Sequence, residues 1–260
     1  MSRPALSVVI PAYNESPRLE STLDRVVDYL GQRREDFEIL VVDDGSSDAT
    51  ADLAADFHQD RQQREASGQA SRTPSSWSLR VLANSRNRGK GYSVRRGMLE
   101  AQGHYALLSD ADLSTPIAEL AKLEEKVRKG PFLLAFGSRG LKDSRVEIPQ
   151  NQLRKYSGRL FNRTMRLLTG LPFHDTQCGF KLFEMRHCRP LFELQRLEGF
   201  GFDVEILYLA RKKGLRMAEI PVIWRNAEGT SVNLFSGLRA VWDLIVIRYY
   251  DWKGRYQVGS

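Results

Sequence analysis

Cysteine is scarce in this sequence, and its placement excludes several kinds of site. Cys178 and Cys188 are the only two cysteines among 260 residues. They form neither a Cys-x-x-Cys pair nor a zinc-like spacing with the four histidines. Two cysteines are also too few for a disulfide framework, which favours a reducing compartment. We therefore expect a cytoplasmic protein without a structural zinc site.

Long apolar runs are missing as well. A membrane-spanning helix needs about 20 consecutive apolar residues, and no such stretch occurs. Residues 1–4 lead directly into an apolar run and lack the regions of a signal peptide. The nearest approach is 234–252, which Arg239, Asp243 and Arg248 interrupt. It predicts an amphipathic helix that either packs on the protein's own core or lies at a membrane surface. The second alternative predicts a protein that is peripheral to the cytoplasmic face of a membrane.

Several motifs for nucleotide binding and hydrolysis are incomplete. Gly89-Lys90 lacks the upstream glycine of a P-loop, because position 84 is Asn. The glycines around Gly199 do not complete a Gly-x-Gly-x-x-Gly fingerprint, and no Gly-x-Ser-x-Gly elbow is present. The sequence therefore argues against a P-loop, against hydride transfer and against an α/β-hydrolase site.

What the sequence has instead is an excess of positive charge. Lysine and arginine outnumber aspartate and glutamate by 39 to 32, which gives a formal net charge of +7. This balance favours an anionic partner: a nucleic acid, a phosphorylated substrate or an acidic lipid surface. No recognition-helix or RNP-type motif accompanies the charge, so we expect no nucleic-acid partner.

Strand and helix signals alternate along the chain. Short apolar runs predict strands at 6–11, 37–42, 79–82, 105–108, 132–136 and 217–222. Helical patterns predict helices at 15–30, after Asp48, at 91–101, from Pro116, at 151–168 and at 203–211. Residues 178–180 are predicted as a turn. This alternation is typical of an α/β fold, a single domain with a mostly parallel central sheet flanked by helices.

Two segments fall outside this alternation. Residues 61–78 are rich in Gln, Ser, Arg and Gly and lack apolar periodicity, which predicts an exposed loop within the domain. The C-terminal segment, 231–260, contains the amphipathic helix. We therefore expect one domain over 1–230 and a C-terminal helix with a membrane-surface contact after it.

Polar residues cluster where the predicted strands end, at 11–15, 43–46 and 110–112. Ligands of open α/β sheets bind beyond the carboxyl ends of the strands, so these segments are expected to converge. Asp110 and Asp112, with one small residue between them, offer the oxygen ligands that Mg²⁺ or Mn²⁺ prefers. Such a cation would also bind a diphosphate and neutralise its charge as it leaves. The alternative is a surface turn, where aspartate is common.

Four segments carry a resemblance to a known family. They are Val-Val-Ile-Pro-Ala-Tyr-Asn-Glu (8–15), Val-Val-Asp-Asp-Gly-Ser-Ser-Asp (41–48), Asn-Arg-Gly-Lys-Gly (87–91) and Ser-Asp-Ala-Asp-Leu-Ser-Thr-Pro (109–116). Their order resembles that of family 2 inverting glycosyltransferases with the GT-A nucleotide-diphospho-sugar transferase fold. Two further segments, 175–183 and 201–207, are similar to the dolichyl- or polyprenyl-phosphate glucosyltransferase and mannosyltransferase branch. The sequence Leu-Ser-Thr-Pro favours the glucosyltransferases of this branch.

The resemblance implies roles for these residues. The nucleotide-sugar would contact Pro11, Ala12, Tyr13, Glu15, Asp44, Lys90, Asp110 and Ala111. Asp110 and Asp112 would hold Mg²⁺ or Mn²⁺, and Ser114 stands where relatives often carry Gln near the metal. The catalytic residues would be Asp112, Arg139 and Asp175. The acceptor phosphate would contact Arg139, Arg154 and Ser157, with Asn162 in the same pattern.

The implied reaction is transfer of one hexose, glucose from UDP-glucose, to a polyprenyl or dolichyl phosphate with inversion at the anomeric carbon. A phosphate acceptor is already anionic at neutral pH, so the reaction needs no strong base. Arg139 would instead balance the charge of the acceptor. Three alternatives stay open at this point: GDP-mannose as the donor, a saccharide hydroxyl as the acceptor, and a catalytically silent nucleotide-sugar-binding protein.

Overall fold

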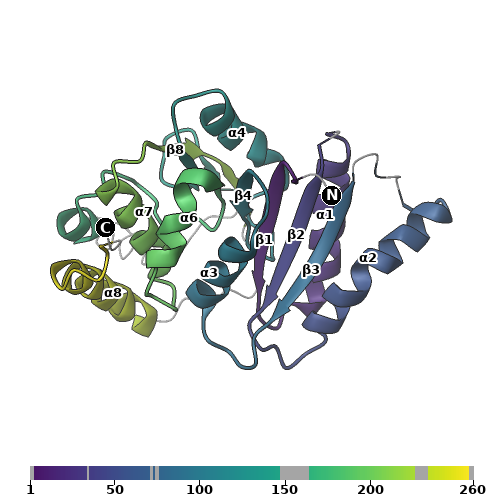
Figure 1. The fold of residues 1–260 in the computed structure, drawn as a ribbon, viewed down its shortest axis with the longest axis horizontal. Coiled ribbons are helices and arrows are strands. Elements are labelled where there is room, and N and C mark those ends of the chain that lie inside the picture. The colour runs from purple at the N-terminus through teal and green to yellow at the C-terminus, as the bar shows by residue number, and fades with distance from the viewer. Residues whose placement is uncertain are drawn as a thin grey trace.

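A seven-stranded sheet forms the centre of the fold, with its strands in the order β3-β2-β1-β4-β7-β5-β8 (Figure 1). The computed structural model describes residues 3–33, 35–70, 73, 76–146, 164–225 and 234–257. The strands are β1 (Leu6–Ala12), β2 (Phe37–Asp43), β3 (Trp77–Ala83), β4 (Tyr105–Leu108), β5 (Leu134–Ser138), β7 (Lys181–Glu184) and β8 (Met217–Pro221). A second sheet pairs β6 (Arg145–Val146) with β9 (Ile223–Trp224). In the large sheet only β7 is antiparallel, to both β4 and β5.

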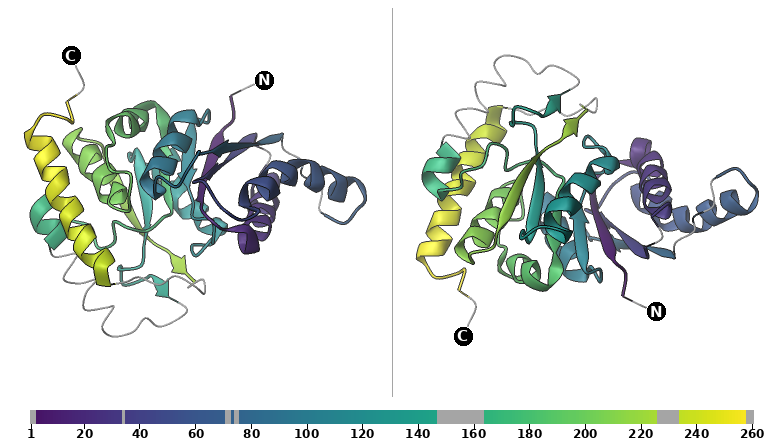
Figure 2. Two further views of the ribbon diagram at one scale, coloured as in Figure 1. Left: turned by 90° about the horizontal axis from the view of Figure 1, so that it is seen from below. Right: turned by 90° about the horizontal axis from the view of Figure 1, so that it is seen from above.

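Helices cover both faces of this sheet (Figure 2). They are α1 (Ser16–Gly31), α2 (Thr50–Ala66), α3 (Lys90–Glu100), the 3-10 turn η1 (Ile117–Glu119), α4 (Leu120–Arg128), α6 (Met185–Leu194), α7 (Phe202–Lys212) and α8 (Leu234–Trp252). Successive side chains of a strand point to opposite faces. Val8 and Ile10 of β1 therefore pack with α1, α2 and α4, whereas Val9 packs with α3, α6 and α7. The predicted α/β fold with a mostly parallel sheet is confirmed.

The loop predicted at 61–78 is shorter than expected. Helix α2 continues through Ala66, and β3 already begins at Trp77. Arg61 is buried within α2, where it forms ion pairs with Asp24 and Asp28 of α1. A stretch without apolar periodicity is thus helical, because its charged side chains are paired with a neighbouring helix.

Strand β7 lies where the sequence predicts only a turn followed by an unassigned segment. Its buried Lys181 interrupts the apolar pattern that marks the other strands. The helix predicted at 151–168 falls mostly outside the described residues, and residues 164–169 are helical. The helix predicted from Pro116 begins as η1, with Pro116 as its N-cap, and continues as α4.

The predicted C-terminal helix is present as α8, which lies beside α7 in all views (Figures 1 and 2). Leu244 and Ile247 of α8 are buried in the core, so one face of the helix packs on the protein itself. Among the described residues, no helix combines the length and the apolar character needed to cross a membrane.

Candidate active site

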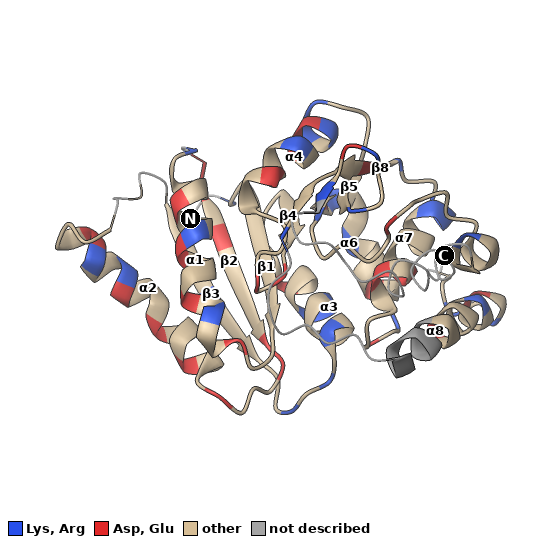
Figure 3. Cartoon of the chain, turned by 180° about the vertical axis from the view of Figure 1, so that it is seen from behind, with Lys and Arg blue, Asp and Glu red and all other residues tan. Residues whose placement is uncertain are grey.

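The carboxyl ends of the parallel strands meet at one edge of the sheet. Ala12 at the end of β1 is in register with Asp43 at the end of β2, and β4 ends at Leu108 beside Val9. Strand β7 runs in the opposite direction, so its first residue, Lys181, lies beside Leu108 at the same edge. Acidic residues gather on the loops that follow β1 and β2 (Figure 3). The three polar segments at 11–15, 43–46 and 110–112 therefore follow strands that end at one edge of the sheet.

Hydrogen bonds fix the loops after β1 and β2 to each other. Asn14 has a φ of 54°, a left-handed conformation that asparagine tolerates. Its N–H donates to Ser46 Oγ over 2.9 Å, and its side-chain oxygen accepts the N–H of Ser47 over 2.9 Å. The N–H of Glu15 donates to Thr50 Oγ1 over 2.8 Å. Of the pocket residues predicted around the end of β1, Pro11 is half-buried, Ala12 is buried and Tyr13 is 48% exposed.

Asp44 is buried and positions the loop that precedes α3. Its carboxylate accepts the N–H groups of Arg88 at 3.0 Å and Gly89 at 2.7 Å, and the amide of Asn84 at 2.8 Å. Gly89 has a φ of 103°, which a residue with a side chain rarely adopts. Asp44 therefore determines where Lys90 begins α3. The predicted contact of Asp44 with the base or ribose stays a prediction.

Asp110 is held from two sides. Lys90 Nζ donates to its Oδ1 over 2.5 Å. Its Oδ2 lies over the backbone of Gly179, where a Cβ atom would approach that oxygen to 2.1 Å. Burial acts to lower the pKa of Lys90, but the carboxylates of Asp110 and Asp203 raise this pKa above its ordinary value. Lys90 therefore carries its positive charge at neutral pH.

The second aspartate of the motif is also fixed. Asp112 accepts both the N–H and the hydroxyl of Ser114, each over 2.8 Å. Leu113 between them has a φ of 44°, which is rare for a bulky side chain and marks local backbone strain. The carbonyl of buried Ala111 accepts the hydroxyl of Thr22 over 2.6 Å. Asp110 and Asp112 are thus oriented by their own loop and by the helices beside it.

The residues around this motif fit a divalent cation that is shared with a substrate. Burial raises the pKa of Glu15, and the Arg18 charge opposes this rise. The Asp112 and Asp110 carboxylates raise the pKa of Glu15 further. The negative charge that acts on Glu15 is the same charge that would attract a cation. In the ranges that the structure describes, no group of three or more His, Cys, Asp or Glu side chains could hold a metal by itself. Mg²⁺ is commonly bound through one or two carboxylates together with substrate phosphates. Asp110 and Asp112 offer that donor set.

Arg139, at the end of β5, is oriented by Asp175. The Arg139 Nε donates to Asp175 Oδ2 over 2.6 Å and a terminal nitrogen donates to Oδ1 over 2.9 Å, a bidentate pair. Burial acts to raise the pKa of Asp175, but the charge and hydrogen bonds of Arg139 lower it below its ordinary value. The N–H of Asp175 in turn donates to Oε1 of Glu219, in β8, over 2.8 Å. Asp175 is therefore an ionised group that orients a cation.

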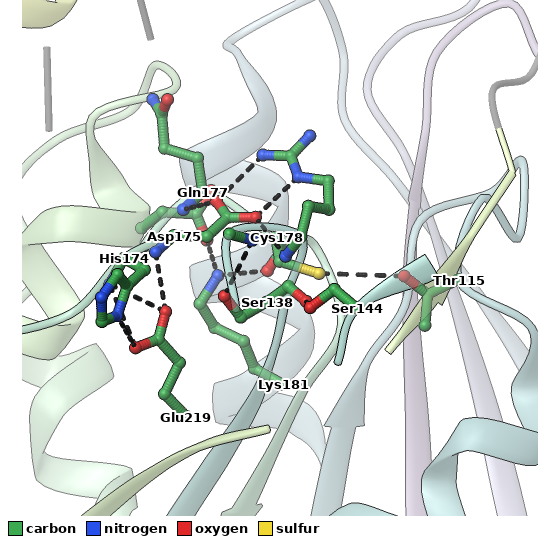
Figure 4. A network of polar contacts seen from close by, with 12 residues as sticks. Thr115, Ser138, Ser144, His174, Asp175, Gln177, Cys178, Lys181 and Glu219 are labelled. Atoms are coloured by element: carbon green, nitrogen blue, oxygen red, sulfur yellow. Dashed lines mark hydrogen bonds and ion pairs between the residues drawn. The ribbon is translucent and has the colours of Figure 1, made fainter. Parts of the chain in front are cut away.

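A buried ion pair joins the start of β7 to α7. Lys181 Nζ donates to Asp203 Oδ1 and to the carbonyl of Cys178, both over 2.5 Å. Burial raises the pKa of Asp203, although the Lys181 and Lys90 charges act against this. Figure 4 shows Lys181 beneath Asp175 and Cys178 and close to the loop that carries them. Asp203 thus lies between the charges of Lys181 and Lys90.

Sequence reasoning located some of these residues and missed others. Arg154, Ser157 and Asn162 lie outside the described residues, so their roles stay predictions. Gly179, Lys181, Asp203 and Glu219 were not predicted as site residues. The segment 175–183 carried a signal for the first two, but nothing in the sequence pairs Lys181 with Asp203, which is 22 positions away.

Comparison with known proteins gives a consistent result. The profile of the family described as Glycosyl transferase family 2 matches residues 7–192. The chain is 35% identical to the dolichyl-phosphate beta-glucosyltransferase of Dictyostelium discoideum, over 98% of this chain and 77% of that protein. It is 36% identical to the dolichyl-phosphate beta-glucosyltransferase of Drosophila melanogaster, over 98% of this chain and 76% of that protein. The protein of the same name from Homo sapiens is 33% identical, with the same two shares of 98% and 76%.

Solved structures share the fold at lower identity. Mannosyl-3-phosphoglycerate synthase from Rubrobacter xylanophilus matches with a TM-score of 0.64 and 19% identity, over 99% of this chain and 77% of that one. Glucosyl-3-phosphoglycerate synthase from Mycobacterium tuberculosis, crystallised with Mn²⁺, UDP-glucose and phosphoglyceric acid, matches with a TM-score of 0.62 and 17% identity, over 99% and 81% of the two chains. The GT-A fold is thereby confirmed.

Proposed function

The chain belongs to glycosyl transferase family 2, and from this premise we propose that it transfers glucose from UDP-glucose to a dolichyl or polyprenyl phosphate. Relatives at 31–36% identity that are named dolichyl-phosphate beta-glucosyltransferases support this sugar and this acceptor. One structural observation carries the proposal. A fixed pair of carboxylates, Asp110 and Asp112, lies at the same sheet edge as Arg139, whose guanidinium Asp175 orients. Such a site can hold two anionic groups side by side.

The carboxylate side would receive the donor. A bound Mg²⁺ or Mn²⁺, held by Asp110 and Asp112, would neutralise the charge that develops on the leaving nucleoside diphosphate. Lys90, at the N-terminus of α3, contributes a second positive charge beside Asp110. The loops that carry Tyr13 and Glu15 would enclose the nucleotide. Their hydrogen bonds to the loop after β2 keep this half of the site in shape before the donor binds.

The arginine side would receive the acceptor phosphate. A phosphate monoester carries close to two negative charges at pH 7, so it attacks the anomeric carbon without a general base. Asp175 is ionised and engaged by Arg139, and it acts in this proposal as a positioning residue. Arg139 neutralises the nucleophile and aligns it opposite the departing diphosphate. This in-line geometry inverts the anomeric carbon. Arg154 and Ser157 remain predicted helpers on this side.

Helix α8 presents a surface that suits a membrane-bound acceptor. Its outer face carries a row of exposed apolar residues at helical spacing: Trp242 (62% exposed), Ile245 (46%), Tyr249 (48%) and Trp252 (77%). The Lys253 ammonium lies 4.8 Å from the centre of the Trp252 ring. Tryptophan and tyrosine beside basic residues are typical of helices that lie in the interface of an anionic lipid bilayer. We take this row, the α8 aromatic row, as the contact with the membrane.

A further exposed apolar side chain belongs to a segment beside α8. Residues 164–169, teal green in Figure 2, lie beside the yellow α8 in both views, and their Leu167 is 83% exposed. We place the reaction at the cytoplasmic face of the membrane. The absence of disulfide bonding supports this location, since Cys178 and Cys188 are both free and buried.

The test is a transfer assay with purified protein, Mg²⁺ or Mn²⁺, and a polyprenyl phosphate in detergent or vesicles. UDP-glucose, GDP-mannose and UDP-N-acetylglucosamine are offered separately. Glucosyl lipid from UDP-glucose alone is the expected product, with metal chelation abolishing it. Mannosyl lipid from GDP-mannose would change the sugar and keep the acceptor. Product on a saccharide hydroxyl, and none on the lipid phosphate, would overturn the proposed acceptor.

A further inference from the structure

We propose that Lys90 occupies the cation position of the donor-free site, so that a divalent cation binds together with the donor diphosphate and not before it. The inference rests on the proposed function, because it concerns the order in which the donor site fills. It begins from an observation that this function does not require. The carboxylate expected to hold the metal, Asp110, already has a cation on it.

Lys90 is a fixed cation and not a freely solvated lysine. It is the first residue of α3, directly after Gly89, and Asp44 anchors the backbone N–H groups of Arg88 and Gly89. Only 22% of the Lys90 side chain is exposed. Its ammonium is therefore delivered to Asp110 by the fold, at the edge of the sheet where the predicted metal ligands meet.

Three of the four carboxylate oxygens of Asp110 and Asp112 already accept a hydrogen bond. Asp110 uses Oδ1 for Lys90, and its Oδ2 is packed over Gly179. Asp112 uses one oxygen for the Ser114 N–H and the other for the Ser114 hydroxyl. A divalent cation that arrives alone must therefore displace or approach an ammonium of like charge, which opposes its binding.

A diphosphate changes this balance. Its oxygens offer new charge-assisted partners both to the ammonium and to the divalent cation. Lys90 can then pass from Asp110 to a phosphate oxygen, and Asp110 becomes available to the metal. Metal and diphosphate should consequently bind with positive coupling, and linkage requires each to raise the affinity of the other by the same factor. Lys90 in this scheme is a positioning residue that sets the order of binding.

The experiment measures free Mn²⁺ by electron paramagnetic resonance during titration of the protein, with and without UDP at fixed ionic strength. The variants are Lys90→Met, Lys90→Arg and the control Lys122→Met. Lys122 is half-exposed and pairs with Glu119, so its loss removes one positive charge away from Asp110. The double variant Lys90→Met/Asp110→Asn reports whether any new Mn²⁺ site uses Asp110. Circular dichroism melts establish that each variant is folded.

We expect wild type, Lys90→Arg and Lys122→Met to bind Mn²⁺ weakly alone and tightly with UDP. Lys90→Met should bind Mn²⁺ alone roughly tenfold more tightly than wild type, the effect of about 1.4 kcal/mol of relieved repulsion. The double variant should lose this gain. Unchanged Mn²⁺ affinity in folded Lys90→Met, with UDP-dependent binding intact in wild type, would overturn the inference and leave the proposed function standing. Wild type that binds no Mn²⁺ even with UDP would instead contradict the proposed donor site itself.

Discussion

At position 179 the absence of a side chain determines where Asp110 can lie. A Cβ atom there would come within 2.1 Å of one carboxylate oxygen and within 2.4 Å of the carboxyl carbon. The backbone of Gly179 does not adopt a left-handed conformation, so the requirement for glycine arises from this close approach alone. Gly179 therefore helps to determine the orientation of the Asp110 carboxylate.

Gly179→Ala should move the Asp110 carboxylate and impair transfer more than folding. A displacement of about 1 Å at a reacting group lowers kcat/KM by on the order of 100-fold. The matched control is Gly199→Ala, because no atom lies within 4 Å of a Cβ built at that position. The measurement is kcat/KM for glucose transfer together with the melting temperature. Equal activity in both variants would show that Asp110 does not depend on Gly179.

The pair of Asp175 and Arg139 links stability to pH. Asp175 has a lowered pKa in the folded protein, so its ionised form stabilises the fold. This contribution is complete above the unfolded carboxyl pKa of about 4 and is lost as the pH falls through the lower folded pKa. Asp175→Asn should reduce the free energy of unfolding by about 2 kcal/mol at pH 7, because a charged hydrogen-bond partner of Arg139 is removed.

The pH dependence distinguishes this effect from a simple change of shape. The difference in unfolding free energy between wild type and Asp175→Asn should shrink as the pH falls below about 4. Urea unfolding at several pH values measures it. The control is Asp143→Asn, at an exposed aspartate in the loop after β5. A difference that stays constant down to about pH 2 would contradict an ionised Asp175 as its source.

At the scale of elements, the sequence predicts those whose signal is local. Strands β1 and β2 are recognisable because their apolar runs are buried on both faces of the sheet. The last turns of α2 depend on Arg61, whose partners lie on α1, and β7 depends on pairing with β4 and β5. No local pattern reports these partners, so the end of α2 was predicted as a loop and β7 was not predicted.

The same distinction applies to the site. The position of Asp110 and Asp112 at the sheet edge was predictable because they closely follow a buried strand. The partner of Arg139 is 36 positions away, and nothing in the sequence pairs Arg139 with Asp175. Polar residues at the ends of strands can therefore be predicted from one sequence. The ion pairs that orient them cannot, because the partners are distant in the sequence and meet only in the folded chain.

Helix α8 has two apolar faces, of which only one is buried by the protein. Replacing Trp242 and Trp252 with serine should remove two exposed indoles without disturbing the buried Leu244 and Ile247. If each indole contributes about 1–2 kcal/mol on entering the lipid interface, the loss of both lowers vesicle binding by roughly 30- to 700-fold. Vesicle sedimentation measures this loss. Transfer to a long-chain polyprenyl phosphate in vesicles should fall with it.

A short water-soluble acceptor provides the internal control for this variant. The α8 aromatic row contributes no residue to the donor carboxylates or to the Arg139 pair, so transfer to a short-chain phosphate should remain at the wild-type rate. A parallel fall with both acceptors would mean that the substitutions damage the catalytic domain. An unchanged rate with both would show that α8 does not bring the enzyme to its acceptor.

At the scale of the whole molecule, the net charge of +7 and the α8 aromatic row are expected to contribute to the proposed membrane binding in different ways. Electrostatic attraction to anionic lipid is distributed over many lysines and arginines, and salt screens it over a Debye length that shrinks from about 10 Å at 0.1 M to about 3 Å at 1 M. Insertion of aromatic side chains is local, and salt leaves it in place. The two contributions should therefore be separable in one binding experiment.

Wild-type protein should bind anionic vesicles more tightly than neutral ones at low salt, and the two affinities should converge as salt rises, because only the electrostatic part is screened. The doubly substituted α8 variant should keep the salt-dependent part and lose the remainder. Sedimentation with vesicles of phosphatidylcholine, with and without phosphatidylserine, at increasing sodium chloride measures both. Salt-independent binding of wild type to anionic vesicles would assign the whole interaction to the aromatic row. Complete loss of wild-type binding at high salt would assign the whole interaction to charge. This outcome would contradict membrane insertion of the α8 aromatic row.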